Sequence, residues 1–226
     1  MKALIATNVV MFLATTFIPG LENQLALVPA RVVHGPRIYE LVTYMFIHAG
    51  LLHILFNMLA LWMFGTELEH MWGTRFFLKF YFIAGIGAGA LTVLLTLLPI
   101  AALRQLYISP IVGASGAIYG LLLAYGLYFP DRRIYMYLLF PIPARVFVLI
   151  MGAIALYLSL SDNGVANATH LSGLLVAYVY LKGARLRLNP WAEVKYRYIK
   201  WKFNRVRKKF DVYSGGKNDE WNRRVH

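Results

Sequence analysis

Six apolar runs constrain this chain more than any other feature. A helix that crosses the hydrocarbon core of a bilayer needs about 20 apolar residues, and each run approaches or reaches that length. The runs cover residues 3–19, 51–65, 76–98, 113–129, 146–160 and 168–181. Hydrophobic residues make up 59% of the chain and charged residues only 15%, too few to cover a water-soluble domain of this size. The pattern predicts an all-α membrane protein, a bundle of six transmembrane helices.

The positive charge gathers at the C-terminal end. The net charge is +13, and from Lys182 onward the chain has 14 lysines and arginines against four acids. Basic loops stay on the cytoplasmic side of a membrane, so both termini are expected there. We expect residues 1–182 to form the membrane domain. Residues 183–226 are expected to form a basic cytoplasmic tail, with an interfacial helix that starts at Asn189-Pro190 and then a disordered end.

The tail suggests a surface partner and a location. A basic segment next to a membrane attracts anionic lipid, and we expect this partner and no nucleic acid. The expected location is a prokaryotic plasma (inner) membrane, with the chain as an integral multi-pass protein. The long connection 20–47 between the first two runs is expected to have structure of its own and to lie partly in the external interface.

Four of the polar residues inside apolar runs are the candidates for a functional site, because polar groups are costly there. They are His53, Asn57, Ser115 and His170. If the second run ends at Thr66 and the others end correspondingly, the two histidines and the serine lie roughly 18–21 Å above the cytoplasmic ends of their helices. Asn57 lies one turn below His53 on the same helix face. The sequence therefore predicts one polar layer shared by three helices.

This layer has the residue types that a serine protease needs. A serine hydroxyl is a weak nucleophile until a base takes its proton, and imidazole is the usual base near neutral pH. Ser115 is expected at the start of its helix, where free N–H groups favour an anion. Asn57 and His53 can donate to the same oxyanion. Gly113 and Gly116 would let a substrate backbone approach closely.

Structural alternatives exist for each motif. Gly-Ala-Ser-Gly at 113–116 is also typical of close helix packing, and a lone membrane histidine often only packs. The glycine-rich segment 85–90 is expected to pack helices rather than bind a nucleotide, because it lies within an apolar run. His48 and His53 are five residues apart, which on one helix would separate them by about 140°. That spacing argues against a paired metal site, and no metal is expected.

Three separate motifs resemble those of the rhomboid protease family. The first joins His48, His53 and Asn57, the second is Gly-Ala-Ser-Gly at 113–116 with Tyr119 one turn later, and the third is Ala166, His170 and Gly173. Their order and helix numbers match the family over about residues 41–181.

The resemblance implies a six-helix rhomboid fold and an intramembrane serine endopeptidase. Ser115 and His170 would form the catalytic dyad, and Tyr119 would stack on the His170 ring. His53, Asn57 and the Ser115 N–H would form the oxyanion hole. Asn167 would lie beside the site.

Further implications concern support and partners. Residues 65–73 would form a turn after the second helix, in which Glu69 has a structural role. The small residues Gly173 and Ala177 would pack the sixth helix against the fourth. Substrates would be single-span membrane proteins, no cofactor is implied, and the oligomeric state stays open.

Other membrane protein classes fit less well. The His-Glu-x-x-His motif of zinc proteases is absent. Aspartyl proteases need two acids within the bilayer, but the acids near the runs are all expected at helix ends or in loops: Glu22, Glu40, Glu67, Glu69, Asp131 and Asp162. A transporter is commonly built from internal repeats, and the sequence shows no such repeat. The remaining alternative is a catalytically inactive rhomboid-like protein that binds membrane clients.

Overall fold

The computed structural model describes residues 1–100, 103–136, 140–159, 165–187 and 198. These residues belong to two units, Met1–Leu181 and Lys182–His226, and the structure of the first is described below. The predicted tail helix and its disordered end lie outside the described residues, so they stay predictions, as does the division into two domains.

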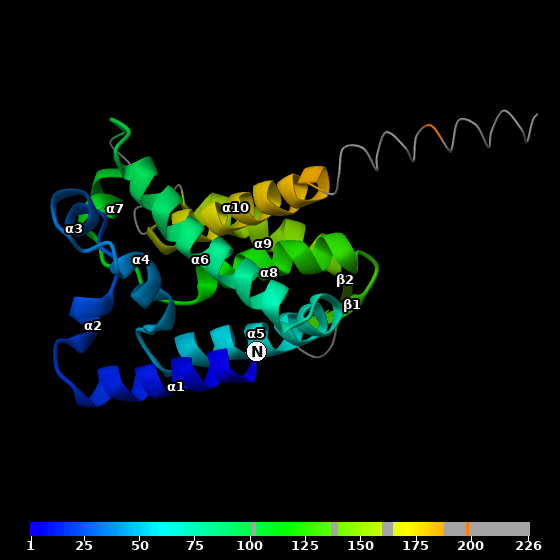
Figure 1. Ribbon diagram of the computed structural model, residues 1–226, viewed down its shortest axis with the longest axis horizontal. Helices are drawn as coiled ribbons and strands as arrows, with labels where there is room; N and C mark the ends of the chain where they lie inside the picture. The colour runs from blue at the N-terminus through cyan, green and yellow to red at the C-terminus, as the bar shows by residue number, and fades with distance from the viewer. Residues whose placement is uncertain (101–102, 137–139, 160–164, 188–197, 199–226) are drawn as a thin grey trace, which may run out of the picture. The chain divides into compact units, whose positions relative to one another are not determined.

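Six longer helices correspond to the six apolar runs. They are α1 (Lys2–Phe17), α5 (Leu51–Trp72), α6 (Thr74–Thr96), α8 (Ser115–Tyr128), α9 (Ala144–Ser159) and α10 (Val165–Arg187). In Figure 1, α1 and α5 run alongside each other, while α3, α4 and α7 gather at one end of the helices and the strands at the other. A bilayer favours this helical form because a helix satisfies its own backbone hydrogen bonds.

Two of the described helices are long and apolar enough to cross a membrane, α5 and α6. Three more are apolar but shorter: α1, α8 and α9. Large apolar side chains on the outer faces remain exposed, including Leu55, Phe56 and Trp62 of α5 and Leu149 of α9. A surface of this kind suits contact with lipid. The predicted total of six spans stays a prediction.

Helix α8 is buried on almost every side. Its buried residues are Gly116, Ala117, Ile118, Tyr119, Gly120, Leu121, Leu122, Ala124, Tyr125 and Gly126. Helices α5, α6 and α9 all pack against it. A helix that is apolar all round is typical of a core position. The packing of α8 therefore holds Ser115, its first residue, in a fixed position.

Small residues allow the helices to approach closely. A Cβ atom on Gly173 of α10 would lie 2.0 Å from the Gly116 carbonyl oxygen of α8, and one on Gly120 would lie 3.2 Å from Ala177 Cβ. The predicted packing of these two helices is therefore confirmed. A Cβ on Gly85 of α6 would lie 2.1 Å from Met45 Cε, so the glycine-rich segment also packs as predicted.

The external connection forms structure of its own, as expected. It contains α2 (Leu21–Leu25), α3 (Pro29–His34), α4 (Glu40–Thr43) and the 3-10 helix η1 (Tyr44–Phe46). Helices α3 and α4 pack on α6, and α3 also contacts α7 (Arg104–Ile108). At the other end, β1 (Arg133–Met136) and β2 (Phe140–Pro143) pair antiparallel between α8 and α9.

Two predictions about the second helix are wrong. Residues 65–73 do not form a turn, because α5 continues through Gly65 to Trp72 and ends only at Gly73, with a φ of 77°. Gly65 does not break the helix, since it is buried against Phe77 and Leu61. Thr66 is therefore not the helix end, and the end used to place His53 is too early. Glu67 and Glu69 consequently lie within the last turns of a helix rather than beyond it.

Candidate active site

Ser115 is the first residue of α8, as predicted. The chain reaches it through Gly113, whose φ of 119° is a conformation that favours glycine. The Gly113 N–H donates to the Tyr44 carbonyl at 2.9 Å. A Cβ atom on Gly113 would also lie only 2.8 Å from His53 Nε2. Both the backbone turn and the nearby imidazole therefore require glycine at position 113, two residues before this serine.

His170 lies beside the serine. Its Nε2 atom is 2.8 Å from Ser115 Oγ, although the two residues are 55 positions apart in the sequence. The close packing of Gly173 on Gly116 makes this distance possible, because it lets α10 lie directly against the first turn of α8. The pair lies within hydrogen-bond distance, so the hydroxyl proton has an acceptor.

The ring of Tyr119 supports the His170 imidazole. The two ring centroids are 4.3 Å apart and the planes differ by only 8°. His170 Nδ1 is buried and has no hydrogen-bond partner among the residues that the structure describes. Among the residues that the structure describes, the Tyr119 ring and the serine hydroxyl are therefore the contacts that orient this imidazole.

His53 and Asn57 lie on α5 opposite the serine. His53 Nδ1 accepts the Ala49 N–H at 3.4 Å. A neutral imidazole whose Nδ1 accepts must carry its proton on Nε2, and Nε2 is the atom that faces Gly113. Asn57 Nδ2 donates to the His53 carbonyl at 2.8 Å, which leaves its second N–H for another acceptor. Both side chains therefore have a donor available near the serine.

The expected separation of His48 and His53 is wrong. His48 precedes α5, which begins at Leu51, so the two histidines do not share a helix. Their rings meet edge to face, with centroids 5.1 Å apart. His48 is buried and its ring lies against that of His53, while its supporting role stays a prediction. No group of three histidine or acidic side chains that could hold a metal ion occurs in the part of the chain that the structure describes.

The other predicted residues have different surroundings. The space beside Gly116 is occupied by other residues of the protein. A Cβ there would lie 2.9 Å from Ala88 Cβ and 3.3 Å from the Tyr44 hydroxyl. Helix packing, rather than substrate approach, therefore explains this glycine. Asn167 is half-buried in the first turn of α10, and its predicted place beside the site stays a prediction.

An open apolar groove of about 740 Å³ begins at Ser115 and Asn57. Helices α5 and α9 form its walls, α8 forms its floor, and Ile134 and Tyr135 of β1 line it as well. The two walls meet where the Phe64 and Phe147 rings stack, with centroids 6.1 Å apart. Ser115 is one of the lining residues, so the groove reaches the serine.

Sequence reasoning missed the part played by the external connection. Leu27 and Ile111 exchange backbone hydrogen bonds of 3.0 and 2.8 Å, and Tyr44 accepts the N–H of Gly113. These contacts hold the residues just before Ser115. Backbone atoms make these contacts, so they could not be predicted from a side-chain motif in the sequence.

Comparisons with known proteins identify the family. A model of the Rhomboid domain matches residues 35–185. The chain is 29% identical to RHOMBOID-like protein 12, mitochondrial, of Arabidopsis thaliana, over 63% of this chain and 45% of that protein. It is 30% identical to Rhomboid protein 1, mitochondrial, of Saccharomyces cerevisiae, over 60% of this chain and 38% of that protein.

A bacterial relative matches as well. Identity to Rhomboid protease GluP of Bacillus subtilis is 34%, over 61% of this chain and 24% of that protein. The chain thus spans less than half of the length of each of these curated relatives. The match of the Rhomboid domain covers most of the chain, and the resemblance read from the three motifs is confirmed. The chain belongs to the rhomboid family of membrane-embedded proteins.

Proposed function

We propose that this chain is an intramembrane serine endopeptidase. The observation that carries the proposal is the 2.8 Å distance between Ser115 Oγ and His170 Nε2 at the head of an apolar groove. The name of one relative, Rhomboid protease GluP, supports the same activity. The alternative, a rhomboid-like protein that binds clients without cutting them, needs no such pair.

The geometry supports a two-step acyl transfer. His170 Nε2 takes the proton of Ser115 as Oγ attacks a peptide carbonyl, and then gives that proton to the leaving amine. The oxyanion formed on the carbonyl accepts hydrogen bonds from the Ser115 N–H, Asn57 Nδ2 and His53 Nε2. A water molecule then repeats the attack on the acyl-enzyme, with His170 again as the base, and releases the second product.

Transmembrane segments of single-span proteins are the substrates that we propose. The groove lining is almost wholly apolar, apart from Asn57, Ser115 and the ring hydroxyls of Tyr119 and Tyr135. A substrate helix must open locally before Ser115 can reach a peptide carbonyl, since helical amides are already paired.

The same proposal includes the membrane topology of the chain and the binding partner of its basic tail. Both termini lie on the cytoplasmic side, and the basic tail beyond Lys182 binds anionic lipid and no nucleic acid. One of the relatives is a bacterial protein, and others are named as mitochondrial or chloroplastic. The proposed location in a prokaryotic inner membrane is therefore argued from the sequence alone.

The proposed function is tested with purified chain in lipid vesicles. We expect cleavage of a single-span substrate within or next to its transmembrane segment, and covalent labelling of Ser115 by a fluorophosphonate, located by peptide mass spectrometry. If the folded protein binds such substrates but neither cuts them nor takes the label, the client-binding alternative holds.

Asn57→Ala is expected to reduce kcat without abolishing it. The substitution removes one oxyanion donor of three, so the expected loss is about 100- to 1,000-fold, or about 3 kcal/mol in the barrier. Steady-state kinetics with the same substrate measure it.

Asn8→Ala is the matched control for Asn57→Ala. Asn8 is a buried amide of α1 whose Nδ2 also donates to the carbonyl four residues earlier, at 2.8 Å. Its loss should affect thermal stability and leave kcat close to wild type. Equal loss of kcat in both variants would mean that Asn57 acts only through packing.

A further inference from the structure

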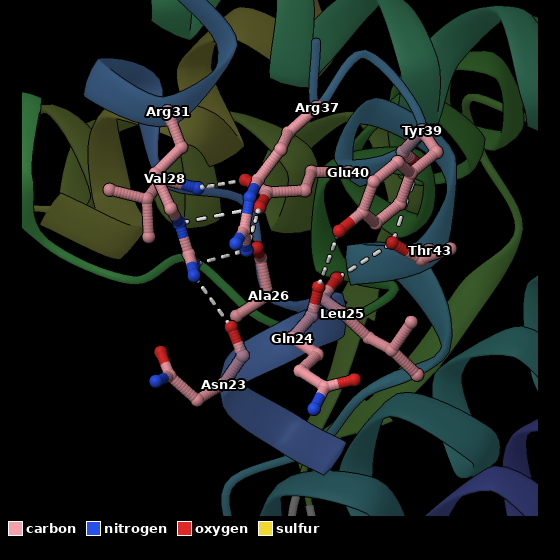
Figure 2. A network of polar contacts seen from close by, with 10 residues as sticks. All are labelled: Asn23, Gln24, Leu25, Ala26, Val28, Arg31, Arg37, Tyr39, Glu40 and Thr43. Carbon is pink, nitrogen blue, oxygen red and sulfur yellow. Dashed lines mark hydrogen bonds and ion pairs between the residues drawn. The ribbon is translucent and has the colours of Figure 1, made fainter. Parts of the chain in front are cut away.

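Glu40 is a fully buried carboxylate outside the Ser115–His170 site. Its Oε2 accepts the Val28 N–H at 2.9 Å. Its Oε1 forms ion pairs with Arg31 Nε at 3.3 Å and with Arg37 Nη1 at 3.6 Å. Figure 2 shows Arg31 and Arg37 on either side of this carboxylate, with the ion pairs as dashed lines. A buried charge is strongly unfavourable without such partners, so the fold of the surrounding segment depends on Glu40.

Arg31 extends the network to the backbone. Its Nη1 donates to the Asn23 carbonyl at 2.7 Å and its Nη2 to the Ala26 carbonyl at 3.2 Å (Figure 2). The Thr43 hydroxyl donates to the Leu25 carbonyl at 2.7 Å. The two Arg31 bonds join α2 and the residue after it to α3, and the Thr43 bond joins the end of α2 to α4. The external connection is therefore folded around one carboxylate.

Two neighbours of this network hold the loop that leads to Ser115. Leu27, next to Val28, pairs with Ile111 through two backbone hydrogen bonds. Tyr44, one turn after Glu40, accepts the Gly113 N–H, and its hydroxyl donates to the Gly85 carbonyl of α6 at 2.6 Å. Glu40 lies between the two contacts along the chain, twelve residues after Val28 and four before Tyr44.

We propose that Glu40 is a positioning residue for the backbone N–H of Ser115. Ile111 and Gly113 determine where the chain enters α8, and so where the first free N–H of that helix points. This inference rests on the proposed function, in which that N–H donates to the oxyanion. Glu40 does not touch the substrate; it acts through Val28 and Leu27 on one side and Tyr44 on the other.

The test is Glu40→Gln in the full chain in lipid vesicles. Glutamine keeps the size and an acceptor for Val28 but leaves Arg31 and Arg37 without their counter-charge. We expect kcat per active site to fall by about 30-fold, since small displacements of catalytic groups can cost up to about 100-fold. KM for a single-span substrate should stay within about twofold of wild type. Inactivation by a fluorophosphonate should slow by a factor similar to kcat.

Active sites are counted by fluorophosphonate titration, so that unfolded protein does not lower the measured kcat. A purely structural role would reduce the number of titrated sites but leave kcat per site unchanged. Tyr39→Phe is the matched control, because it removes only the hydroxyl that donates to the Gln24 carbonyl at 3.3 Å in the same segment. Its kcat and KM should equal those of wild type.

The outcomes separate the two proposals. If wild type cuts, Ser115→Ala does not, and Glu40→Gln has wild-type kcat per site, the positioning role of Glu40 is wrong while the protease proposal stands. If wild type neither cuts nor takes the label, the proposed function itself fails. Should Glu40→Gln not fold, Glu40→Asp, which keeps the charge on a shorter side chain, decides: reduced kcat per site with unchanged KM supports the role, and wild-type kcat overturns it.

Discussion

Ser115→Ala, His170→Ala and the double variant are expected to show the same near-zero turnover of a transmembrane substrate. Without the hydroxyl the imidazole has no proton to take, and without the imidazole the hydroxyl is barely nucleophilic. Each single change should lower kcat by at least about 10⁴-fold, and the second change should add almost nothing. Kinetics of one substrate with all four proteins measure the coupling.

Suitable controls lie elsewhere in the chain. Ser159→Ala and His70→Ala alter the same residue types at a half-buried and an exposed position outside the site and should keep wild-type activity. Each variant must first show wild-type thermal stability. Substrate binding should survive Ser115→Ala, since a hydroxyl contributes little to docking. Substantial cleavage by Ser115→Ala, or independent effects of the two single changes, would refute the dyad.

Gly173→Ala is expected to lower activity by about 100-fold through packing alone. The added methyl group would lie 2.0 Å from the Gly116 carbonyl oxygen, a backbone atom that cannot turn aside as a flexible side chain could, so α8 and α10 must separate. The hydrogen bond between Ser115 and His170 spans the same two helices. Overpacking of this kind destabilises a fold by about 1–3 kcal/mol, and a shift of about 1 Å can lower kcat by about 100-fold.

Gly183→Ala is the matched control on α10. A Cβ atom at Gly183 would meet nothing within 4 Å, so the same chemical change should leave fluorophosphonate labelling and thermal stability unchanged or slightly improved. Reduced labelling in Gly173→Ala with normal labelling in Gly183→Ala supports the packing argument. Normal labelling in both would mean that the helices tolerate a wider spacing than the structure indicates.

Much of the helical arrangement could be predicted from the sequence. In lipid the backbone must form its own hydrogen bonds, so each apolar run corresponds to a helix whose position follows from the run. The end of α5 could not be read in this way. Gly65 looks like a terminator in the sequence, but in the fold it is a contact surface for Phe77, and tertiary packing outweighed local preference.

The candidate site was predictable in its residues but not in its supports. Ser115 and His170 are polar groups within apolar runs, and that cost makes them conspicuous. His48 was misplaced because the sequence does not show that the helix begins only at Leu51. Glu40 was taken for a loop acid, because burial of a charge depends on partners brought together only by folding, such as Arg31.

The pairing of Leu27 with Ile111 has a consequence for how these proteins diverge. Both hydrogen bonds run between main-chain atoms, so they do not depend on the identity of either side chain. Any residue that accepts an extended backbone can occupy these two positions, and only proline, which has no N–H to donate, would remove a bond. Two homologues can therefore share this feature of the active-site loop while their sequences show no similarity there.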